Sequence, residues 1–401
     1  MAERYPGGVI SKTPPTVTPP VAGEGGSASG MWTLDTVLEY EKAGAWPKPV
    51  LPRELYAWGR NDNGQVGDNS TVNKSSPVQI GSLIDWSQIS SANEHSLALK
   101  TNNTLWGWGR NNFGRVGDGT IVYRSSPVQI GALTTWSKVF CRSSSSGAIK
   151  NDYTLWLWGN GGSGQLGQND AISRSSPVQV GALTNWSDAV IGSSVLAVKT
   201  DGTLWAWGFN STGQIGDNTI VSKSSPIQIG SLTNWSKVST DGNRSSAVKT
   251  DGTVWSWGNN NNGQLGLNDL TNRSSPVQVG ALTNWSLVSV AAYFTAAVKS
   301  DNSIWLWGNN LHGQLGDGSV TYRSSPVQIG SLTNWLTASA NSQSFAAVKN
   351  DGTLWTWGRN QYGQLGANNT ASRSSPVQVG AKTNWNRVAV SQFGATAITK
   401  G

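Results

Sequence analysis

The most constraining feature of the sequence is a unit of about fifty residues that occurs seven times. Each copy contains a Trp-Gly pair, and the copies are 49 or 50 residues apart. The tryptophans of these pairs are Trp58, Trp108, Trp158, Trp207, Trp257, Trp307 and Trp357. Two further markers accompany each pair, namely Ser-Ser-Pro and a tryptophan that follows a short polar stretch, as in Leu-Thr-Asn-Trp at 282–285. A fixed period of this length indicates a repeat architecture, in which each unit packs against its neighbours.

Each repeat can be divided into four short strand-like runs. In one repeat these runs are 235–240, 245–250, 253–258 and 276–280. The second and third runs are joined by Asp251-Gly252, a dipeptide that accepts the positive φ angles of a tight hairpin. In the third run Trp255 and Trp257 alternate with smaller side chains, as a strand requires. No helix of useful length fits inside a repeat.

Four antiparallel strands in each of seven copies predict an all-β fold, a seven-bladed β-propeller over residues 51–401. The first copy begins at its third strand, near Leu55, whereas the chain ends after a first and a second strand at 385–400. The two ends complement each other. We therefore predict that 385–400 and 55–81 form one shared blade, which closes the ring and protects strand edges that an open ring would expose.

Residues 1–50 differ from the repeats in composition, and we predict an extended N-terminal arm. Pro14–Pro20 should be extended, and residues 33–43 should form a short helix that begins after Thr33 and ends at Gly44. A helix of about ten residues is marginal in isolation, so it needs a surface to lie on. We predict that the arm docks on a partner through Trp32, Leu34, Val37, Leu38, Tyr40 and Trp46. The alternative is that the helix packs on its own propeller.

Composition narrows the possible roles. Twenty of the 22 tryptophans occupy three repeat positions, which suits structural wedges between blades better than a ligand-binding or light-absorbing cluster. Cys141 is the only cysteine, so no disulfide can form within the chain. The sequence has no apolar run long enough to span a membrane and no apolar signal segment at its N-terminus.

Basic side chains fall into two repeat registers, and the net charge is +7. One register precedes Ser-Ser-Pro: Lys74, Arg124, Arg174, Lys223, Arg273, Arg323 and Arg373. The other ends the second strand: Lys100, Lys150, Lys199, Lys249, Lys299 and Lys349. Such rings could meet an anionic polysaccharide, a membrane surface or a nucleic acid, or each arginine could bind loop carbonyls. Because the charge is symmetric rather than confined to one patch, we expect no nucleic-acid partner.

The sequence offers little for catalysis, and we expect no enzymatic activity, no cofactor and no metal site. No glutamate follows Glu94, and the only histidines are His95 and His312, in non-equivalent loops. The aspartates lie mainly in turns and lack the clustering that a hard cation requires.

Positions that vary between copies are better candidates for function than those that repeat, since loops on a fixed scaffold carry binding residues. One variable set precedes or begins the second strand: His95, Arg244, Tyr293, Phe294 and Phe345. A second set follows Trp-Gly: Phe113, Phe209, His312 and Tyr362. We predict that these side chains are exposed on display loops and bind a partner, the alternative being ordinary drift at loop tips.

The repeat resembles the regulator-of-chromosome-condensation family of propellers. The resemblance covers residues 52–401 and is carried by Ala-Val-Lys-Thr-Asp-Gly-Thr-x-Trp-x-Trp-Gly-x-Asn-x-x-Gly-Gln-Leu-Gly, as at 247–266, and by the later Pro-Val-Gln. That family includes an exchange factor for a small GTPase, plant light sensors and bacterial propellers that inhibit β-lactamase. The family's Gly-x-x-His survives only in part, as Asn-Glu-His at 93–95, and no repeat carries an inserted loop. The resemblance implies two alternatives: a bacterial protein-binding or inhibitory propeller, and a GTPase exchange factor or chromatin-binding propeller.

The arm resembles a different group of proteins. Residues 29–47, with Ser-Gly-Met-Trp-Thr-Leu at their start and Ala-Gly-Ala-Trp-Pro at their end, are similar to a segment of virion proteins of marine tailed phages. Our leading hypothesis is therefore a phage virion protein, made in the host cytoplasm and located in the virion. Residues 1–50 would anchor it to other virion proteins, the assembly would set its oligomeric state, and the propeller would be displayed for adhesion to a host cell-surface glycan or protein.

Overall fold

The computed structural model describes residues 4–5, 8–9, 52–341 and 343–401. Strands β1 (Arg4–Tyr5) and β2 (Gly8–Val9) pair antiparallel. The predicted helix at 33–43 and the six predicted docking side chains lie outside the described residues. The propeller itself comprises Arg53–Lys400 and, as predicted, is all-β with no helix among its described residues.

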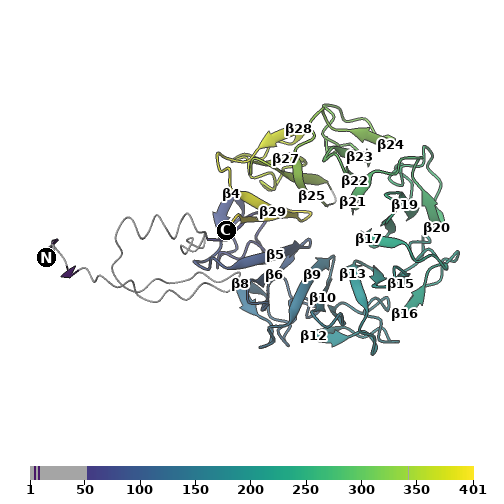
Figure 1. The fold of residues 1–401 in the computed structure, drawn as a ribbon, viewed down its shortest axis with the longest axis horizontal. Coiled ribbons are helices and arrows are strands. Elements are labelled where there is room, and N and C mark those ends of the chain that lie inside the picture. The colour runs from purple at the N-terminus through teal and green to yellow at the C-terminus, as the bar shows by residue number, and fades with distance from the viewer. Residues whose placement is uncertain (1–3, 6–7, 10–51, 342) are drawn as a thin grey trace. The chain divides into compact units, whose positions relative to one another are not determined.

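Seven four-stranded antiparallel sheets are arranged as blades around a ring (Figure 1). Six blades use four consecutive strands each. The first two are β5 (Trp86–Ser91), β6 (His95–Lys100), β7 (Leu105–Gly109), β8 (Arg124–Gln129) and β9 (Trp136–Arg142), β10 (Ser145–Lys150), β11 (Leu155–Gly159), β12 (Arg174–Gln179). The next two are β13 (Trp186–Ile191), β14 (Ser194–Lys199), β15 (Leu204–Gly208), β16 (Lys223–Gln228) and β17 (Trp235–Thr240), β18 (Arg244–Lys249), β19 (Val254–Gly258), β20 (Arg273–Gln278). The last two are β21 (Trp285–Val290), β22 (Phe294–Lys299), β23 (Ile304–Gly308), β24 (Arg323–Gln328) and β25 (Trp335–Asn341), β26 (Ser344–Lys349), β27 (Leu354–Gly358), β28 (Arg373–Gln378).

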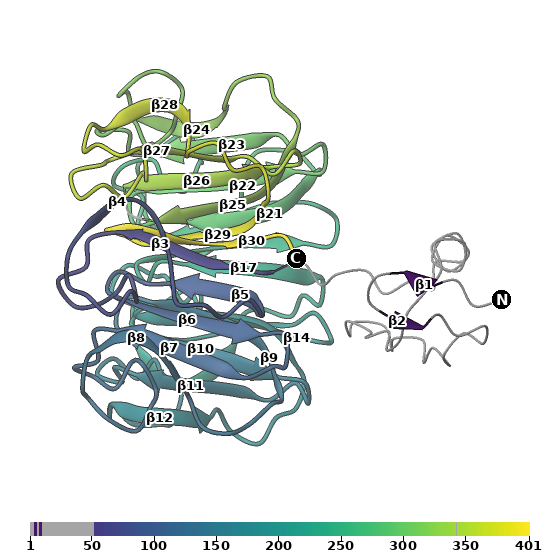
Figure 2. The same ribbon diagram turned by 90° about the vertical axis from the view of Figure 1, so that its left-hand side faces the viewer.

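The first strand of each blade faces the centre of the ring and the fourth lies at its outer edge (Figure 1). Seen from the side, the strands run across the thickness of the propeller (Figure 2). The fourth strand starts earlier than predicted, at Arg273 rather than Pro276, because Arg273 pairs with Gly258 across a register shift in the ladder. Such an irregularity bends and twists a strand locally.

The seventh blade is shared by the two ends of the propeller, as predicted. Its strand order is β29 (Trp385–Val390), β30 (Gly394–Thr399), β3 (Leu55–Gly59) and β4 (Lys74–Gln79). The register between β3 and β30 runs from Leu55 opposite Ile398 to Gly59 opposite Gly394. The backbone N–H of Glu54 also donates to the Thr399 hydroxyl at 2.9 Å. These contacts cross more than 330 residues of sequence, so the ring closes only when the chain is complete.

Three residues of the shared blade differ from those at the same repeat positions in the other blades, and the changes are related. Tyr56 replaces a tryptophan, Thr399 replaces a lysine and Lys382 replaces a leucine. The Lys382 ammonium lies 4.9 Å from the centre of the Tyr56 ring and 3.7 Å from the Glu54 carboxylate. The Tyr56 hydroxyl donates to Glu54 at 2.9 Å. Side chains from both ends of the propeller thus form one small ionic and aromatic cluster at the closure.

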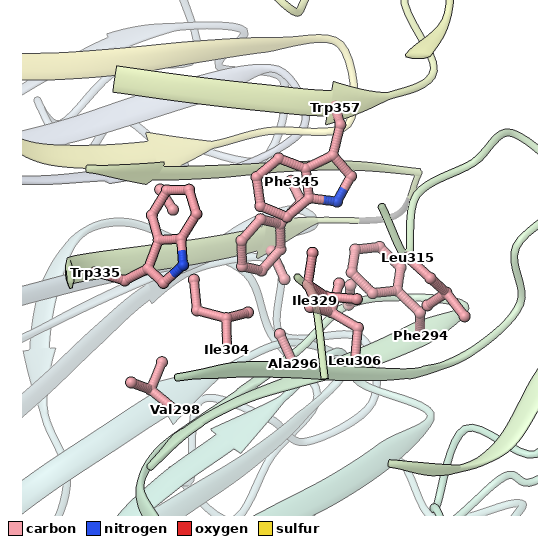
Figure 3. Packing of buried hydrophobic residues seen from close by; sticks show 13 residues of the cluster. Phe294, Ala296, Val298, Ile304, Leu306, Leu315, Ile329, Trp335, Phe345 and Trp357 are labelled. Atoms are coloured by element: carbon pink, nitrogen blue, oxygen red, sulfur yellow. The ribbon is translucent and has the colours of Figure 1, made fainter. Parts of the chain in front are cut away.

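Tryptophan wedges hold the blades together. The Trp357 side chain is fully buried beside Phe345, with ring centres 4.5 Å apart, in a cluster that includes Phe294 and Leu306 (Figure 3). A glycine of the preceding blade, Gly316, lies against the indole, and a Cβ there would come within 2.4 Å of Trp357 Nε1. The two blades can therefore approach closely because Gly316 has no side chain.

We predict that Gly316→Ala destabilises the propeller far more than Gly330→Ala. Both glycines have positive φ, 73° and 62°, so each substitution carries a backbone penalty of about 1–2 kcal/mol. Only at Gly316 would the new methyl group overlap Trp357, since Gly330 has nothing within 4 Å of an added Cβ. Overpacking should add about 1–3 kcal/mol at Gly316, measured by equilibrium denaturation in urea. Equal losses for the two variants would show that the wedge does not limit stability.

Candidate functional site

The propeller has two distinct faces, which follow from its topology. The loop face carries the turns between the first and second strands and the loops between the third and fourth strands. These segments adjoin, as the hydrogen bond from Asn259 N to Asn243 O at 3.0 Å shows. The turn face carries the turns between the second and third strands and the connections into the next blade, which adjoin through Thr250 N and Asn234 O at 2.8 Å.

Three arginines break the symmetry of the loop face. The residue after Trp-Gly is Arg359, Arg60 or Arg110 on three consecutive blades, whereas the other four blades carry Asn160, Phe209, Asn259 and Asn309. We call Arg359, Arg60 and Arg110, with the side chains that contact them, the arginine arc. In this register, the positive charge is therefore confined to three adjacent blades.

Aromatic rings support the centre of the arc. The Arg60 guanidinium lies 5.5 Å from the centre of the Tyr362 ring and 4.9 Å from that of Phe393. The two rings meet edge to face, 5.5 Å apart. Arg60 also pairs with the exposed Asp62 carboxylate at 2.5 Å. The neighbouring Arg359 contacts the side-chain oxygens of Gln343 and Gln361. Stacking fixes the direction of the guanidinium while leaving it reachable, because about a quarter of the Arg60 side chain is exposed (26%).

Glu94 organises the other end of the arc. Arg110 donates to Glu94 Oε2 at 2.7 Å and to the Tyr123 hydroxyl at 3.2 Å, and its pKa is raised, mainly by the hydrogen bond to Glu94. Arg115 lies 3.6 Å from the same carboxylate, but burial lowers its pKa to about 10. The arc and its contacts therefore hold four arginines against two carboxylates, Asp62 and Glu94, and carry net positive charge.

Four predicted display residues are not exposed, and that part of the prediction was wrong. His95, Arg244, Phe294 and Phe345 are completely buried. Each begins or lies within a second strand, and the first three pair with Gly109, Gly258 and Gly308, which have no side chain. Because glycine has no side chain, the side chain opposite it has room to turn towards the next blade. The Phe294 ring, for example, lies 6.4 Å from that of Phe345.

The buried pair of His95 and Ser146 is an inter-blade contact. His95 Nε2 and Ser146 Oγ are 2.8 Å apart, and the Ser146 hydroxyl donates to the Arg115 carbonyl at 2.7 Å. His95 Nδ1 has no hydrogen-bond partner among the described residues. Burial, and then the charge of Arg115, hold the pKa of His95 well below its usual value. The imidazole is therefore a neutral, buried part of the contact between two blades.

The other predicted display residues lie on or near the loop face. Phe113 and Tyr293 are exposed, and Phe209, His312 and Tyr362 are half-buried. Of these five, Tyr362 stacks with Arg60, and Phe113 lies 5.5 Å from the Arg115 guanidinium, so both belong to the arc. Tyr293 instead lines a separate polar cavity of about 200 Å³ with Asp241 and Arg244. The prediction overlooked Arg60, Arg110 and Arg359, although their register after Trp-Gly is visible in the sequence.

Three further observations concern the described residues. A channel of about 230 Å³ lies at the centre of the ring and is lined by all seven first strands, with Ser90, Arg142 and Ser239 among its residues. Within the described ranges, no group of three or more His, Cys, Asp or Glu side chains could hold a metal ion. The same residues include no helix that is long and apolar enough to cross a membrane.

The two basic registers are both engaged within the propeller. In the first register, six side chains pair with a carboxylate of their own loop, and Arg323, for example, lies 2.9 Å from Asp317. Arg273 also donates a hydrogen bond to the Thr271 carbonyl. The pairs are Lys74–Asp68, Arg124–Asp118, Arg174–Asp170, Lys223–Asp217, Arg273–Asp269 and Arg323–Asp317. In the second register, each lysine lies over tryptophan rings on the turn face.

Comparison with known proteins places this architecture in a defined family. The regulator of chromosome condensation (RCC1) repeat matches residues 54–99, 102–149, 154–198, 201–248, 251–298, 301–348 and 351–398, and a second description of the same repeat matches 86–115. No match was found among curated protein sequences. Human WBSCR16 is a similar solved structure, with a TM-score of 0.78, 20% identity, and coverage of 87% of this chain and 99% of that one.

Yeast Prp20 is similar to the same degree. The structure of Prp20p from Saccharomyces cerevisiae has a TM-score of 0.78 and 17% identity, and the alignment covers 87% of this chain and 91% of that one. For the complex of Kap60 with yeast RCC1 (Prp20), the TM-score is 0.78 and the identity 16%, and the alignment covers 88% of this chain and 89% of that one. The closed ring and its repeat chemistry thus define a seven-bladed propeller built from RCC1 repeats. The chain belongs to the RCC1 repeat family, since that repeat matches most of its length.

We predict that His95 makes stability depend on pH below about 6.5. The unfolded chain protonates this histidine near pH 6.5, whereas the folded protein keeps it neutral to much lower pH. Below pH 6.5 the unfolded state therefore binds a proton that the native state does not, and the free energy of unfolding falls by up to about 1.4 kcal/mol per pH unit. His95→Gln should flatten this slope, measured by urea denaturation at several pH values. Partial burial, and then Arg359, also lower the pKa of His312, so His312→Gln is the comparison and should flatten the slope less. An equal effect of the two substitutions would contradict the assignment to His95.

Proposed function

We propose that this protein is a protein-binding propeller that recognises an acidic partner surface through the arginine arc. The observation that carries the proposal is the placement of Arg359, Arg60 and Arg110 on three adjacent blades of an otherwise repetitive ring. Arginine and aromatic side chains are the residues most often responsible for binding energy at protein interfaces. The stacked guanidinium of Arg60 is held in a fixed direction, so less side-chain entropy is lost when a carboxylate binds.

The solved relatives are consistent with a binding role. One is a complex of yeast RCC1 with Kap60, and the description of another names binding of Prp20p to Gsp1p and histones. Those partners belong to the yeast protein, and the identity of 16–17% carries over the fold alone. Exchange of nucleotide on a small GTPase is therefore an alternative to be tested by nucleotide release.

We predict that charge reversal of the arc abolishes partner binding. Arg60→Glu, Arg110→Glu and Arg359→Glu together should remove the positive surface and weaken binding by about 2–5 kcal/mol. The control is Asn160→Glu, Asn259→Glu and Asn309→Glu, which places glutamate in the same register on three of the other four blades. Quantitative affinity capture with both variants, followed by calorimetry on the purified partner at low and high salt, measures the difference. Equal loss in both variants, or no loss in either, would rule out the arc.

A second proposal follows from the sequence of the arm. The likeness of residues 29–47 to phage virion proteins supports a virion structural or display protein, located in the virion and anchored by its first fifty residues. In that case the arc would face a host cell-surface protein or glycan. Deleting residues 1–50 should leave a folded propeller that is absent from purified particles. Unchanged incorporation of the deletion variant would refute the docking role and leave the arginine arc untouched.

A further inference from the structure

The central channel contains one charged side chain, Arg142. It ends β9 and is the only ionisable cation among the described residues that line this channel of about 230 Å³. The side chain is half-buried, so the channel gives access to it, whereas its Nη2 atom is buried without a hydrogen-bond partner in the described part of the chain. Arg142 therefore brings to the channel a guanidinium that can still donate hydrogen bonds.

Two arginines share one carboxylate near the loop-face end of the channel. Asp241 directly follows β17 and lies 3.7 Å from the Arg244 guanidinium. It also acts electrostatically on Arg142, and it is the one carboxylate of the described ranges whose charge influences either arginine. The neighbouring Cys141 adds no charge at neutral pH, because burial raises the pKa of its thiol to about 12. Two positive charges and one negative charge leave a net charge of +1.

This charge excess comes from a single repeat position, the residue at the loop-face end of the first strand. The residues there on the seven blades are Ala92, Arg142, Gly192, Asp241, Ala291, Asn341 and Ser391. The blade between Arg142 and Asp241 carries Gly192, where an added Cβ would come within 2.8 Å of the backbone nitrogen of Gly242. Because no side chain separates the two charged residues at this level, they interact across the intervening blade.

Serine hydroxyls on three consecutive blades add hydrogen-bond donors to the channel. Each Oγ accepts a hydrogen bond from a backbone N–H of the next blade, and Ser239 Oγ, for example, accepts one from Val290 N at 2.8 Å. The serines are Ser239, Ser289 and Ser339, and all three line the channel. Among the described residues, none of the three O–H groups has an acceptor. A hydroxyl donates one hydrogen bond, so each serine can still donate to a group in the channel.

We propose that the central channel binds a small, singly charged carboxylate at Arg142, with serine hydroxyls as additional donors. One negative charge balances the net charge of +1 that Arg142, Arg244 and Asp241 carry. The planar guanidinium matches the two oxygens of a carboxylate. The channel volume corresponds to about seven or eight water molecules at roughly 30 Å³ each, which suits a small acid with a few waters. This site uses none of the arginines of the arginine arc.

Other anions match the channel less well. Sulfate carries two negative charges and would turn the excess of +1 into an excess of −1. Chloride has the right charge, but a single atom cannot accept two parallel hydrogen bonds from one guanidinium. An acidic side chain of a partner protein has the same carboxylate chemistry as a free acid, but it must bring its own backbone to the mouth of the channel.

The experiment titrates the whole chain with sodium acetate and measures binding by saturation-transfer difference NMR at constant ionic strength. The wild-type protein should bind acetate saturably, with a Kd of about 1 mM or below for so small a ligand. Arg142→Gln should weaken binding at least about tenfold, because it removes the charge and the hydrogen bonds made to it. Asp241→Asn keeps an oxygen for the turn but removes the negative charge near Arg142. It should raise the affinity at least about threefold.

The matched control is Arg387→Gln, which makes the same change at an exposed arginine of another first strand, outside the channel lining. It should leave the affinity for acetate unchanged, and thermal unfolding checks that each variant is folded. Absence of saturable binding by the wild-type protein overturns the proposal, and so does an equal affinity of the wild-type and Arg142→Gln proteins.

Two further probes identify the ligand class. Sulfate or chloride that displaces acetate at equal concentration overturns the choice of a carboxylate. The peptide N-acetyl-Gly-Asp-Gly-amide presents a carboxylate on a backbone. If it binds through Arg142 more tightly than acetate does, the ligand is an acidic side chain of a partner, and the assignment to a free acid is overturned.

Discussion

Among the described residues, an indole N–H group that donates across five of the seven blade boundaries is the polar contact on which the packing of the ring most depends. Trp257 Nε1 donates to the Gln214 carbonyl of the preceding blade at 2.9 Å, and Trp58 does the same to Gln364 across the closure, also at 2.9 Å. A buried donor left without an acceptor is costly, so each blade positions the next one. In the part of the chain that the structure describes, Trp307 and Trp357 lack such an acceptor, and Phe345 packs against Trp357 instead.

The architecture was predictable from the sequence because its determinants are local and repeated. The spacing of Trp-Gly, the Asp251-Gly252 hairpin and the missing strands at the two ends were enough to predict seven blades and a shared one. The start of β20 was not predictable. Arg273 pairs with Gly258 across a register shift in the ladder, and no pattern of residues indicates that shift. The helix expected at 33–43 lies outside the described residues and stays a prediction.

The site was harder to predict, because variation between repeats has two physical meanings. His95, Arg244 and Phe294 vary because each fills a different space between blades, opposite a glycine that leaves room for it. Arg60 and Arg359 vary on the surface itself, and only the structure separates the two cases. The sequence also shows Asp85 where most repeats have asparagine, but its meaning depends on the 3.2 Å contact with Lys100.

The two faces of the ring differ in how far the repeats have diverged. On the loop face the repeats have diverged, so one arc of three blades differs from the rest, and a surface that occurs once can bind a partner in one orientation. On the turn face the lysine and its two tryptophans recur with distances that differ by a few tenths of an ångström across five blades. Divergence on the loop face therefore favours that face for a contact with one specific partner, whereas the repeated lysine and tryptophan contacts pack these five blades in the same way.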